Sequence, residues 1–319
     1  MKKKLGFRAF SVLLVIIVAI PVVAYAAYYN TYSVVATIPN DNSCNRAQGF
    51  AVGSSYVYTA KCNDNESKQV IYRTKISDGT TTLMTNGDNS TTYTTYLGHA
   101  NDMDTCTING NYHLFVATMK TGSESLVKLR YSGNTYTKVG NYTITDGNEN
   151  LAISGVKKYK KDANYIYFLF FKCSGESGDV SVYRGKVGLT SNSGTITVTH
   201  AFDINVTNAL VNGSTVSGLN SFSRQGIGYI ASTDQLLVPL TKNNVSIILV
   251  YDNASTATGT VSANSNLSFR ITSSSFPTLF EIEGCDETNG KLYFNCNRKE
   301  DSSDIDHDAV CYFKNFSIS

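Results

Sequence analysis

A chain of 319 residues with 42% hydrophobic and 11% aromatic residues can bury a large core, which excludes a disordered or collagen-like protein. Only 16% of the residues are charged, against roughly 25% in an average soluble domain, and Ser, Thr, Asn, Tyr and Gly are abundant instead. This composition is typical of an extracellular β protein and argues against a helix-rich cytosolic enzyme.

The first 26 residues have the layout of a secretory signal peptide. A basic start, MKKKLGFR, precedes an apolar run and a small-residue motif at Ala24 to Ala26. An uncleaved anchor is the alternative, because the uncharged stretch from Ala9 to Ala27 approaches a membrane span in length. We expect cleavage after residue 26, a secreted or cell-surface protein, and no membrane insertion of the mature chain.

The charge of the mature chain excludes nucleic acid as a partner. Cleavage removes four basic residues and changes the formal net charge from +2 to −2. Beyond the run from Lys157 to Lys161 no basic cluster remains, and nucleic-acid binding needs such a footprint for counterion release. We interpret that run as a solvated hairpin, with a basic aromatic loop that meets wall phosphates as the alternative.

Seven cysteines all follow the leader, and their odd number predicts at least one free or intermolecular thiol. Cys296 and Cys311 lie in two runs that could form a hairpin and bring them together. Cys285 with Cys296, or Cys44 with Cys62, are rival pairs. The sequence contains no CxxC motif, so zinc or thioredoxin-like chemistry has no support.

The rest of the chain predicts an all-β fold made of five similar units. Short alternating runs rich in Val, Ile, Tyr, Phe and Thr recur between Gly, Asn, Asp and Ser turns, without a convincing long helical period. Each unit has a small-residue opening strand and an aromatic-rich second strand. The openings are AQGFAV at 47, HANDMD at 99, LAISGV at 151, RQGIGY at 224 and FEIEGC at 280. Steps of 53, 53, 71 and 58 residues between equivalent positions suit propeller blades with loop insertions.

The fifth unit predicts how the ring closes. It ends after three strands, and TYSVVATI at 31–38 is a strand-like segment without a partner in the first unit. An N-terminal strand that completes the last blade would leave only short, protected edges. We therefore predict a single five-bladed β-propeller in residues 27–319, with strands from 31 to 317. A pair of β-sandwiches is the alternative.

The run LGHANDMD at 97–104, together with AQGFAV, RQGIGY and FEIEGC, resembles the helveticin-J-like bacteriocin family. That family is similar to the propeller of a phage receptor-binding protein and of a teichoic-acid-operon protein. The resemblance covers nearly the whole mature chain, and GHANDM is its most specific part. It implies a five-bladed propeller, an extracellular or cell-surface role and, by analogy with the phage branch, binding of a cell-wall glycan. It implies no reaction.

Polar residues at the unit openings are the candidate ligand site, because they would meet around the axis of the ring. The alternative is that they only hydrogen-bond one another, water or the backbone. His99 is followed closely by Asn101 and Asp102. Their oxygen atoms could bind a metal ion or water together with His99, or the carboxylate could orient the imidazole for general-base chemistry. The predicted ligand-binding residues are Gln48, His99, Asn101, Asp102, Arg224, Gln225, Glu281 and Glu283.

Catalysis and metal binding have less support in the sequence. Asp102 with Glu281 or Glu283 could form the carboxylate pair of a glycoside hydrolase, although the two glutamates share one strand face. The acidic run from Asp301 to Asp308 resembles a calcium loop but lacks its Gly and terminal Glu, so a solvated turn is favoured over calcium binding. No GxSxG, P-loop or HExxH motif occurs. We expect no required cofactor.

Our first hypothesis is a secreted, monomeric and non-catalytic propeller that binds a cell-envelope glycan or a teichoic-acid-like wall polymer, bacteriocin-like in antagonism between bacteria. A carbohydrate-active hydrolase or lyase is the second. A structural surface module is the third. Under the first hypothesis, replacing His99 and Asp102 with alanine abolishes binding and leaves thermal unfolding nearly unchanged.

Overall fold

The computed structural model describes residues 31–173, 175, 177–314 and 316. The expected signal peptide, residues 1–26, lies outside these described residues. Regular structure in the described chain is β apart from two single 3-10 turns, η2 (Gly122–Glu124) and η3 (Leu219–Ser221). None of its helices has the length and apolar character needed to cross a membrane.

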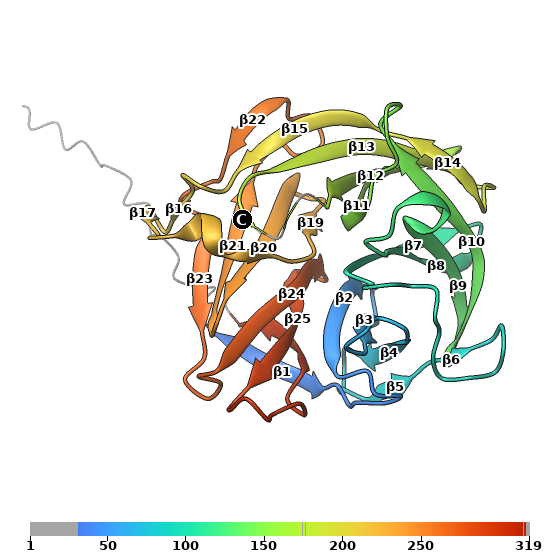
Figure 1. Cartoon of the computed structure of the whole chain (residues 1–319), viewed down its shortest axis with the longest axis horizontal. Helices are drawn as coiled ribbons and strands as arrows, with labels where there is room; N and C mark the ends of the chain where they lie inside the picture. The colour runs from blue at the N-terminus through green and yellow to red at the C-terminus, as the bar shows by residue number, and fades with distance from the viewer. Residues whose placement is uncertain (1–30, 174, 176, 315, 317–319) are drawn as a thin grey trace, which may run out of the picture.

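Five small sheets form a ring around a central axis, so the predicted five-bladed β-propeller is confirmed and the pair of sandwiches is wrong (Figure 1). Blade 1 contains β2 (Arg46–Val52), β3 (Tyr56–Cys62), β4 (Gln69–Lys75) and β5 (Thr81–Leu83). Blade 2 contains β7 (Asp102–Ile108), β8 (Asn111–Ala117), β9 (Leu126–Ser132) and β10 (Thr135–Thr145), which is extended by β6 (Thr85–Asn86) and β14 (Gly194–Thr197).

The other three blades follow the same order from the axis outward. Blade 3 contains β11 (Ile153–Lys161), β12 (Tyr165–Lys172), β13 (Val180–Gly188), β15 (Thr199–Asn205) and β22 (Gly259–Ser262). Blade 4 contains β18 (Ser223–Arg224), β19 (Gly228–Ile230), β20 (Gln235–Lys242), β21 (Val245–Tyr251) and β23 (Phe269–Thr272). Blade 5 contains β24 (Leu279–Thr288), β25 (Lys291–Lys299), β26 (Ala309–Phe313) and β1 (Tyr32–Thr37). A hairpin of β16 (Leu210–Val211) and β17 (Ser214–Thr215) lies outside these sheets.

The ring closes as predicted, with the N-terminal strand in the last blade. In Figure 1 the blue β1 lies beside the red strands of the C-terminal blade. β1 and β26 are antiparallel, from the pair Tyr32 and Phe313 to the pair Thr37 and Ala309. The Tyr32 ring lies 5.3 Å from that of Phe280, so the strand also adds apolar contacts to its blade. Closure removes the exposed edge that β26 would otherwise present.

The 53-residue repeat in the sequence corresponds to contacts between neighbouring inner strands. Thr105 Oγ1 donates to Val52 O at 2.7 Å, and Asn101 Nδ2 donates to Ser154 O at 2.6 Å, each across 53 residues. In blades 4 and 5, Gly226 lies beside Glu283 and Gly228 beside Cys285, which is the same parallel offset, so the inner strands run in the same direction. We call the end where they start the opening end. The other end, with the turns at 53–55, 109–110, 162–164, 231–234 and 289–290, is the hairpin end.

The small residues of the openings are needed because inner strands approach one another closely at the axis. A Cβ atom at Gly49 would lie 2.5 Å from Ala100 O, and one at Gly226 would lie 2.9 Å from Glu283 O. Glycine is the residue that allows such a close backbone approach. The sequence pattern of each opening is thus a packing requirement of the ring.

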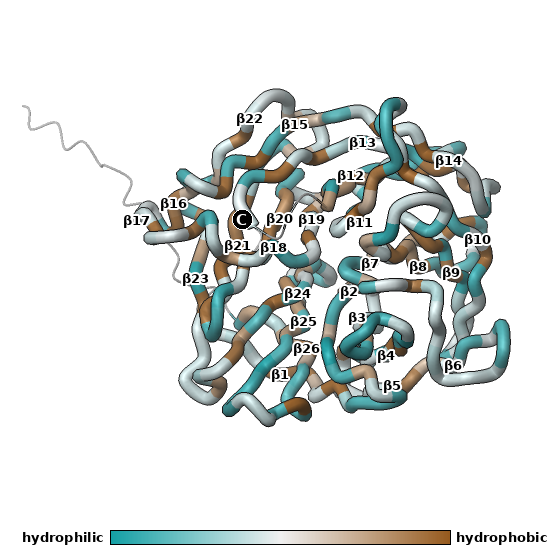
Figure 2. Tube along the Cα trace, viewed as in Figure 1, coloured by the Kyte–Doolittle hydropathy of each residue, from teal (hydrophilic) through white to brown (hydrophobic). Residues whose placement is uncertain are grey.

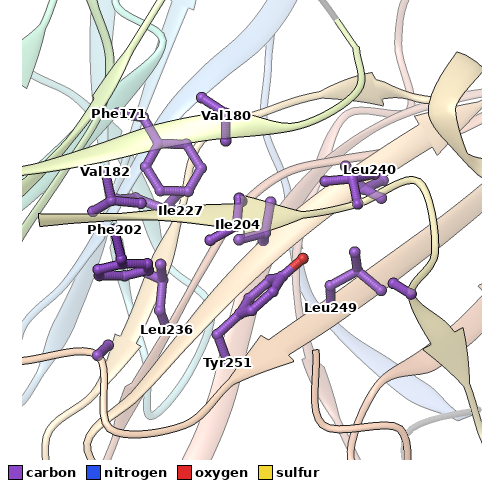
Figure 3. Packing of buried hydrophobic residues seen from close by; sticks show 14 of the residues in the cluster. Phe171, Val180, Val182, Phe202, Ile204, Ile227, Leu236, Leu240, Leu249 and Tyr251 are labelled. Carbon is purple, nitrogen blue, oxygen red and sulfur yellow. The ribbon is translucent and has the colours of Figure 1, made fainter. Parts of the chain in front are cut away.

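The core is divided among the spaces between blades. Figure 2 shows hydrophobic positions along the strands around the whole ring. Between blades 3 and 4, Phe171 and Phe202 pack towards Leu236 and Tyr251, and all four side chains are buried (Figure 3). Burial of each such side chain contributes about 1.5–3 kcal/mol. Cys44, Cys62, Cys106, Cys285, Cys296 and Cys311 are free thiols, and Cys296 and Cys311 lie in the predicted hairpin of β25 and β26.

Candidate functional site

The predicted ligand residues lie at or next to the inner-strand starts, and three of them come together. Gln225 Nε2 donates to Glu281 Oε1 at 2.7 Å, and Asn297 Nδ2 donates to both Glu281 and Glu283. These shared contacts confirm that the two glutamates occupy one strand face. Gln48 is buried, and its Oε1 has no hydrogen-bond partner in the described part of the chain.

Glu283 is a buried acid in contact with a second carboxyl group. Burial and the neighbouring Glu281 carboxylate raise the pKa of Glu283 well above its ordinary value. Both carboxyl groups accept from the same Asn297 amide group, so they lie side by side on the strand face and are held by structural contacts.

The other predicted residues make local contacts instead of converging. His99 Nδ1 lies 2.8 Å from Glu66 Oε1, so Glu66 of blade 1 orients the imidazole and the expected role of Asp102 beside His99 is wrong. Asn101 is held by the Ser154 carbonyl. Arg224 donates to backbone carbonyls that precede β13.

Asp102 belongs to the centre of the ring. It is fully buried, and its Oδ1 accepts from Lys157 Nζ at 3.1 Å and from Met103 N at 2.9 Å. Its Oδ2 accepts from Val156 N at 2.9 Å and from Ile227 N at 3.3 Å. One carboxylate therefore joins blades 2, 3 and 4. The expectation that its replacement with alanine leaves stability unchanged is wrong, because these donors would lose their acceptor.

Lys157 completes the connection between all five blades. Its Nζ donates to Phe50 O at 3.0 Å in blade 1 and to Met103 O at 2.6 Å in blade 2, and lies 3.7 Å from Asp286 Oδ2 in blade 5. We call Lys157, Asp102 and Asp286 the central ion cluster. The prediction of a solvated hairpin at 157–161 is wrong, because these residues form the inner strand β11, which directs Lys157 inward and leaves Lys160 exposed.

The central ion cluster predicts that stability falls as the pH rises. Burial raises the pKa of Asp102 to about 7 and that of Asp286 to about 6, from an ordinary value of 3.8. The folded chain then holds protons that the unfolded chain has released, so unfolding becomes easier as the pH rises from about 4 to about 7. We expect a lower urea midpoint at about pH 7.5 than at about pH 4.5. A midpoint that is unchanged or higher at pH 7.5 contradicts these shifts.

The acidic loop between β25 and β26 uses its carboxylates for local and structural contacts. Asp304 Oδ2 lies 2.7 Å from His307 Nδ1, and Asp306 accepts from Asn40. Asp308 is buried and pairs with Lys61 at 2.9 Å. In the described part of the chain, no group of three His, Cys, Asp or Glu residues converges in a way that could hold a metal ion.

A cavity of about 390 Å³ lies at the hairpin end, between blades 1 and 2. We call it the tyrosine cavity. Its lining combines aromatic, hydroxyl and cationic side chains, including Tyr56, Tyr58, Arg73, Thr105, Tyr112, Tyr131 and Lys158. It comes from the ends of β2 and β7, the starts of β3 and β8, and the strands that pair with them. None of the eight predicted ligand residues lines it.

The aromatic rings of the tyrosine cavity form a partly exposed stack. The ring of Tyr131 lies 4.9 Å from that of Tyr58 and 5.5 Å from that of Tyr112, at an interplanar angle of 21° to Tyr112. Tyr112 is 55% exposed. The Arg73 guanidinium lies 3.5 Å above the Tyr56 ring, and its Nη1 donates to Asn134 Oδ1 at 3.0 Å, while no carboxylate among the described residues forms an ion pair with it. The cavity thus offers an aromatic face beside a positive charge that no carboxylate neutralises.

A second cavity, of about 140 Å³, adjoins the first at the central axis. Both are lined by Thr105 and Lys158, which places them next to each other. The carboxylates of Asp104, Asp286 and Glu287 also line the second cavity. The hairpin end therefore carries the two adjoining cavities, whereas the sequence-predicted residues lie at the opening end.

A weak sequence signal for the tyrosine cavity exists. The second strands of the first two units carry YVY at 56 and YH at 112 at or next to their first residue, and Arg73 lies in the third strand of the first unit. Tyrosines in strands usually pack inside, so this pattern alone does not separate Tyr112 from a core residue. Only the position of the turns in space identifies the exposed rings.

Comparison with known proteins found neither a matching family model nor a matching curated protein. Solved structures with a similar chain path include an endo-arabinase from Bacteroides thetaiotaomicron, 16% identical, with 90% of this chain and 98% of that chain covered and a TM-score of 0.47. The RS223 beta-xylosidase is 9% identical, and the match covers 88% of this chain and 94% of that chain with a TM-score of 0.48. A beta-fructofuranosidase from Bombyx mori is 9% identical, and the match covers 90% of this chain and 61% of that chain with a TM-score of 0.44.

Proposed function

We propose that this propeller binds an anionic glycan of the cell envelope in the tyrosine cavity, without cleaving it. The observation that carries the proposal is the exposed Tyr112 ring, stacked on Tyr131 at the edge of a 390 Å³ cavity that also contains Arg73. Cavities of roughly 300–1,000 Å³ with a few placed polar groups are typical ligand sites.

The chemistry of the lining fits a sugar that carries a negative group. An exposed tyrosine ring provides an apolar face for the CH groups of a sugar, and its hydroxyl group can exchange hydrogen bonds with sugar hydroxyls. The guanidinium of Arg73 can donate charge-assisted hydrogen bonds to a phosphate or carboxylate, while its Nη1 also donates to Asn134 Oδ1 at 3.0 Å. A wall polymer of the teichoic-acid type combines sugar and phosphate in each unit.

We also propose that the chain is secreted, belongs with the helveticin-J-like proteins and acts on the envelope of other bacteria. The signal-peptide layout of residues 1–26 supports secretion, and the GHANDM motif at 98–103 supports the family. Both features agree with a ligand on the outside of a cell.

Glycoside hydrolysis is the second candidate function, because carboxylates line the adjoining cavity. Burial raises the pKa of Asp286 to about 6, which suits a proton donor to a leaving glycosidic oxygen near neutral pH. Asp104 and Glu287 line the same cavity and could activate water. Hydrolysis of a polymer bound in the tyrosine cavity would release sugar, whereas binding alone would not.

The test is binding of glucose-substituted poly(glycerol phosphate) to the mature chain and to the Arg73→Ala variant. We expect Kd to rise about 10- to 100-fold, because the variant loses charge-assisted hydrogen bonds worth about 1.5–3 kcal/mol. Arg130→Ala is the matched control, since Arg130 is exposed in β9 and lies outside both cavity linings. Equal affinity of both variants and the unsubstituted protein contradicts the proposed site, and release of sugar establishes the second candidate.

A further inference from the structure

We infer that the hairpin end is a multivalent surface, on which blades 3 and 5 provide further contacts to the same polymer chain that enters the tyrosine cavity. This inference rests on the proposed function, and it adds a repeating, polyanionic ligand as the class that the surface selects. The carrying observation is a recurring pair of a tyrosine ring and a cation at the hairpin turns of three blades.

Blades 1 and 3 place this pair at the same position of the blade. In blade 1, Tyr56 starts the second strand, and Arg73 of the third strand lies opposite Tyr58. In blade 3, Tyr165 starts the second strand, and Lys186 of the third strand lies opposite Tyr167. In both blades the cation is therefore opposite the residue two positions after the first tyrosine. The cation lies over the ring at 3.5 Å in blade 1 and at 4.3 Å in blade 3. The arrangement therefore repeats with the fold.

Blade 3 extends the pair into a row of rings. The ring of Tyr167 lies 6.3 Å from that of Tyr165 and 6.1 Å from that of Tyr159, both edge to face. Lys160 Nζ lies 5.1 Å from the Tyr167 ring. Tyr165 is 37% exposed, and Lys160 and Lys186 are exposed as well. This row offers a surface without a cavity, which suits a flexible polymer more than a small molecule.

Blade 5 carries the pair with its two partners exchanged between strands. Lys291 starts the second strand directly after the turn at 289–290, and its Nζ lies 4.7 Å from the ring of Tyr312 in the third strand. Because the inner strands all run in the same direction, this turn lies on the same face as the turns of blades 1 and 3. Three of the five blades thus present a tyrosine and a cation at the hairpin end.

The cations of these pairs are available to an anionic ligand. In the described part of the chain, no carboxylate lies within ion-pair distance of Lys160, Lys186 or Lys291, although Lys75 and Lys172 do have such partners. A surface with several cations that form no ion pair, beside rings that are partly exposed, is complementary to a chain of phosphates and sugars. A neutral glycan would leave these charges unused.

Several weak contacts on one face bind a polymer far more tightly than a single unit. After the first unit is bound, the next contact is intramolecular, and the gain from such linkage reaches about 10²–10⁴.

The experiment compares a long ligand and a short ligand in the mature chain and in the Tyr165→Ala/Lys186→Ala double variant. The long probe is glucose-substituted poly(glycerol phosphate), and the short probe is its single glucosyl glycerol phosphate unit. We expect the affinity for the polymer to fall at least about tenfold and the affinity for the single unit to stay within about twofold. The control is Lys242→Ala, because Lys242 is exposed at the other end of blade 4. Circular dichroism establishes that each variant is folded.

The Arg73→Ala variant separates failure of this inference from failure of the proposed function. If Arg73→Ala weakens both probes and the double variant weakens neither, the tyrosine cavity binds the unit and the multivalent surface is refuted. If Arg73→Ala changes neither probe, or the unsubstituted protein binds neither, the proposed function itself fails and the inference fails with it. Loss of polymer affinity alone in the double variant supports the multivalent surface.

Discussion

Substitution of Lys157 with methionine is expected to destabilise the protein by about 3–5 kcal/mol. Methionine fills a similar volume but cannot donate a hydrogen bond. The variant therefore leaves Asp102 and Asp286 buried without their cation and removes the lysine donor from the carbonyl groups of Phe50 and Met103. Urea denaturation followed by circular dichroism measures the effect as a fall in the transition midpoint.

Lys160→Met in the same strand is the matched control, because Lys160 is exposed and makes no ion pair among the described residues. We expect it to change the free energy of unfolding by less than about 0.5 kcal/mol. A change below about 1 kcal/mol in Lys157→Met would show that the central ion cluster does not hold the blades together.

Removal of β1 is expected to abolish cooperative folding. A chain that starts at Pro39 keeps the pairing of β26 with β25 but lacks its outer partner β1, so it exposes β26 as an edge and uncovers the apolar cluster at Phe280. The expected loss is at least about 5 kcal/mol, which is comparable to the whole stability of a typical domain. The reference is a chain that starts at Thr31, and the measurement is thermal unfolding.

Two further results make this test specific to ring closure. Addition of a peptide of residues 31–39 should restore the cooperative transition, because the strand is held without a covalent link to its blade. Val34→Thr, at a position that is 47% exposed in β1, should change stability by less than about 0.5 kcal/mol. A truncated chain that unfolds at the same temperature as the reference would contradict the closure account.

The repeat and the closure were predictable because they depend on patterns that are local in the sequence. Five openings with small residues reflect the close approach at positions such as Gly49 and Gly226, where a Cβ would meet a neighbouring backbone. The last unit lacks a fourth strand, and the strand-like segment at 31–38 has no partner in the first unit. Together these two features predict that the N-terminal strand completes the last blade. Both signals require only the period of the pattern and the length of each run.

The site was less predictable because it depends on which residues meet across blades. Asp102 and His99 are three positions apart in sequence, yet they have different partners. Asp102 forms an ion pair with Lys157 at the axis, whereas His99 contacts the Glu66 carboxylate in blade 1. The sequence places Lys157 in a basic run that is typical of a solvated turn, and only the register of β11 directs it inward. Tyr112 has no sequence feature that separates it from the buried tyrosines.

The central claim is that the hairpin end binds an anionic wall glycan without cleaving it. The most direct measurement is co-sedimentation of the mature chain with Gram-positive cell walls, before and after removal of teichoic acid, with mass spectrometry of the supernatant for released sugars. We predict that the chain sediments with intact walls, stays in solution with stripped walls and releases no sugar. Equal sedimentation with stripped walls, absence of binding to intact walls, or release of sugar would contradict the claim.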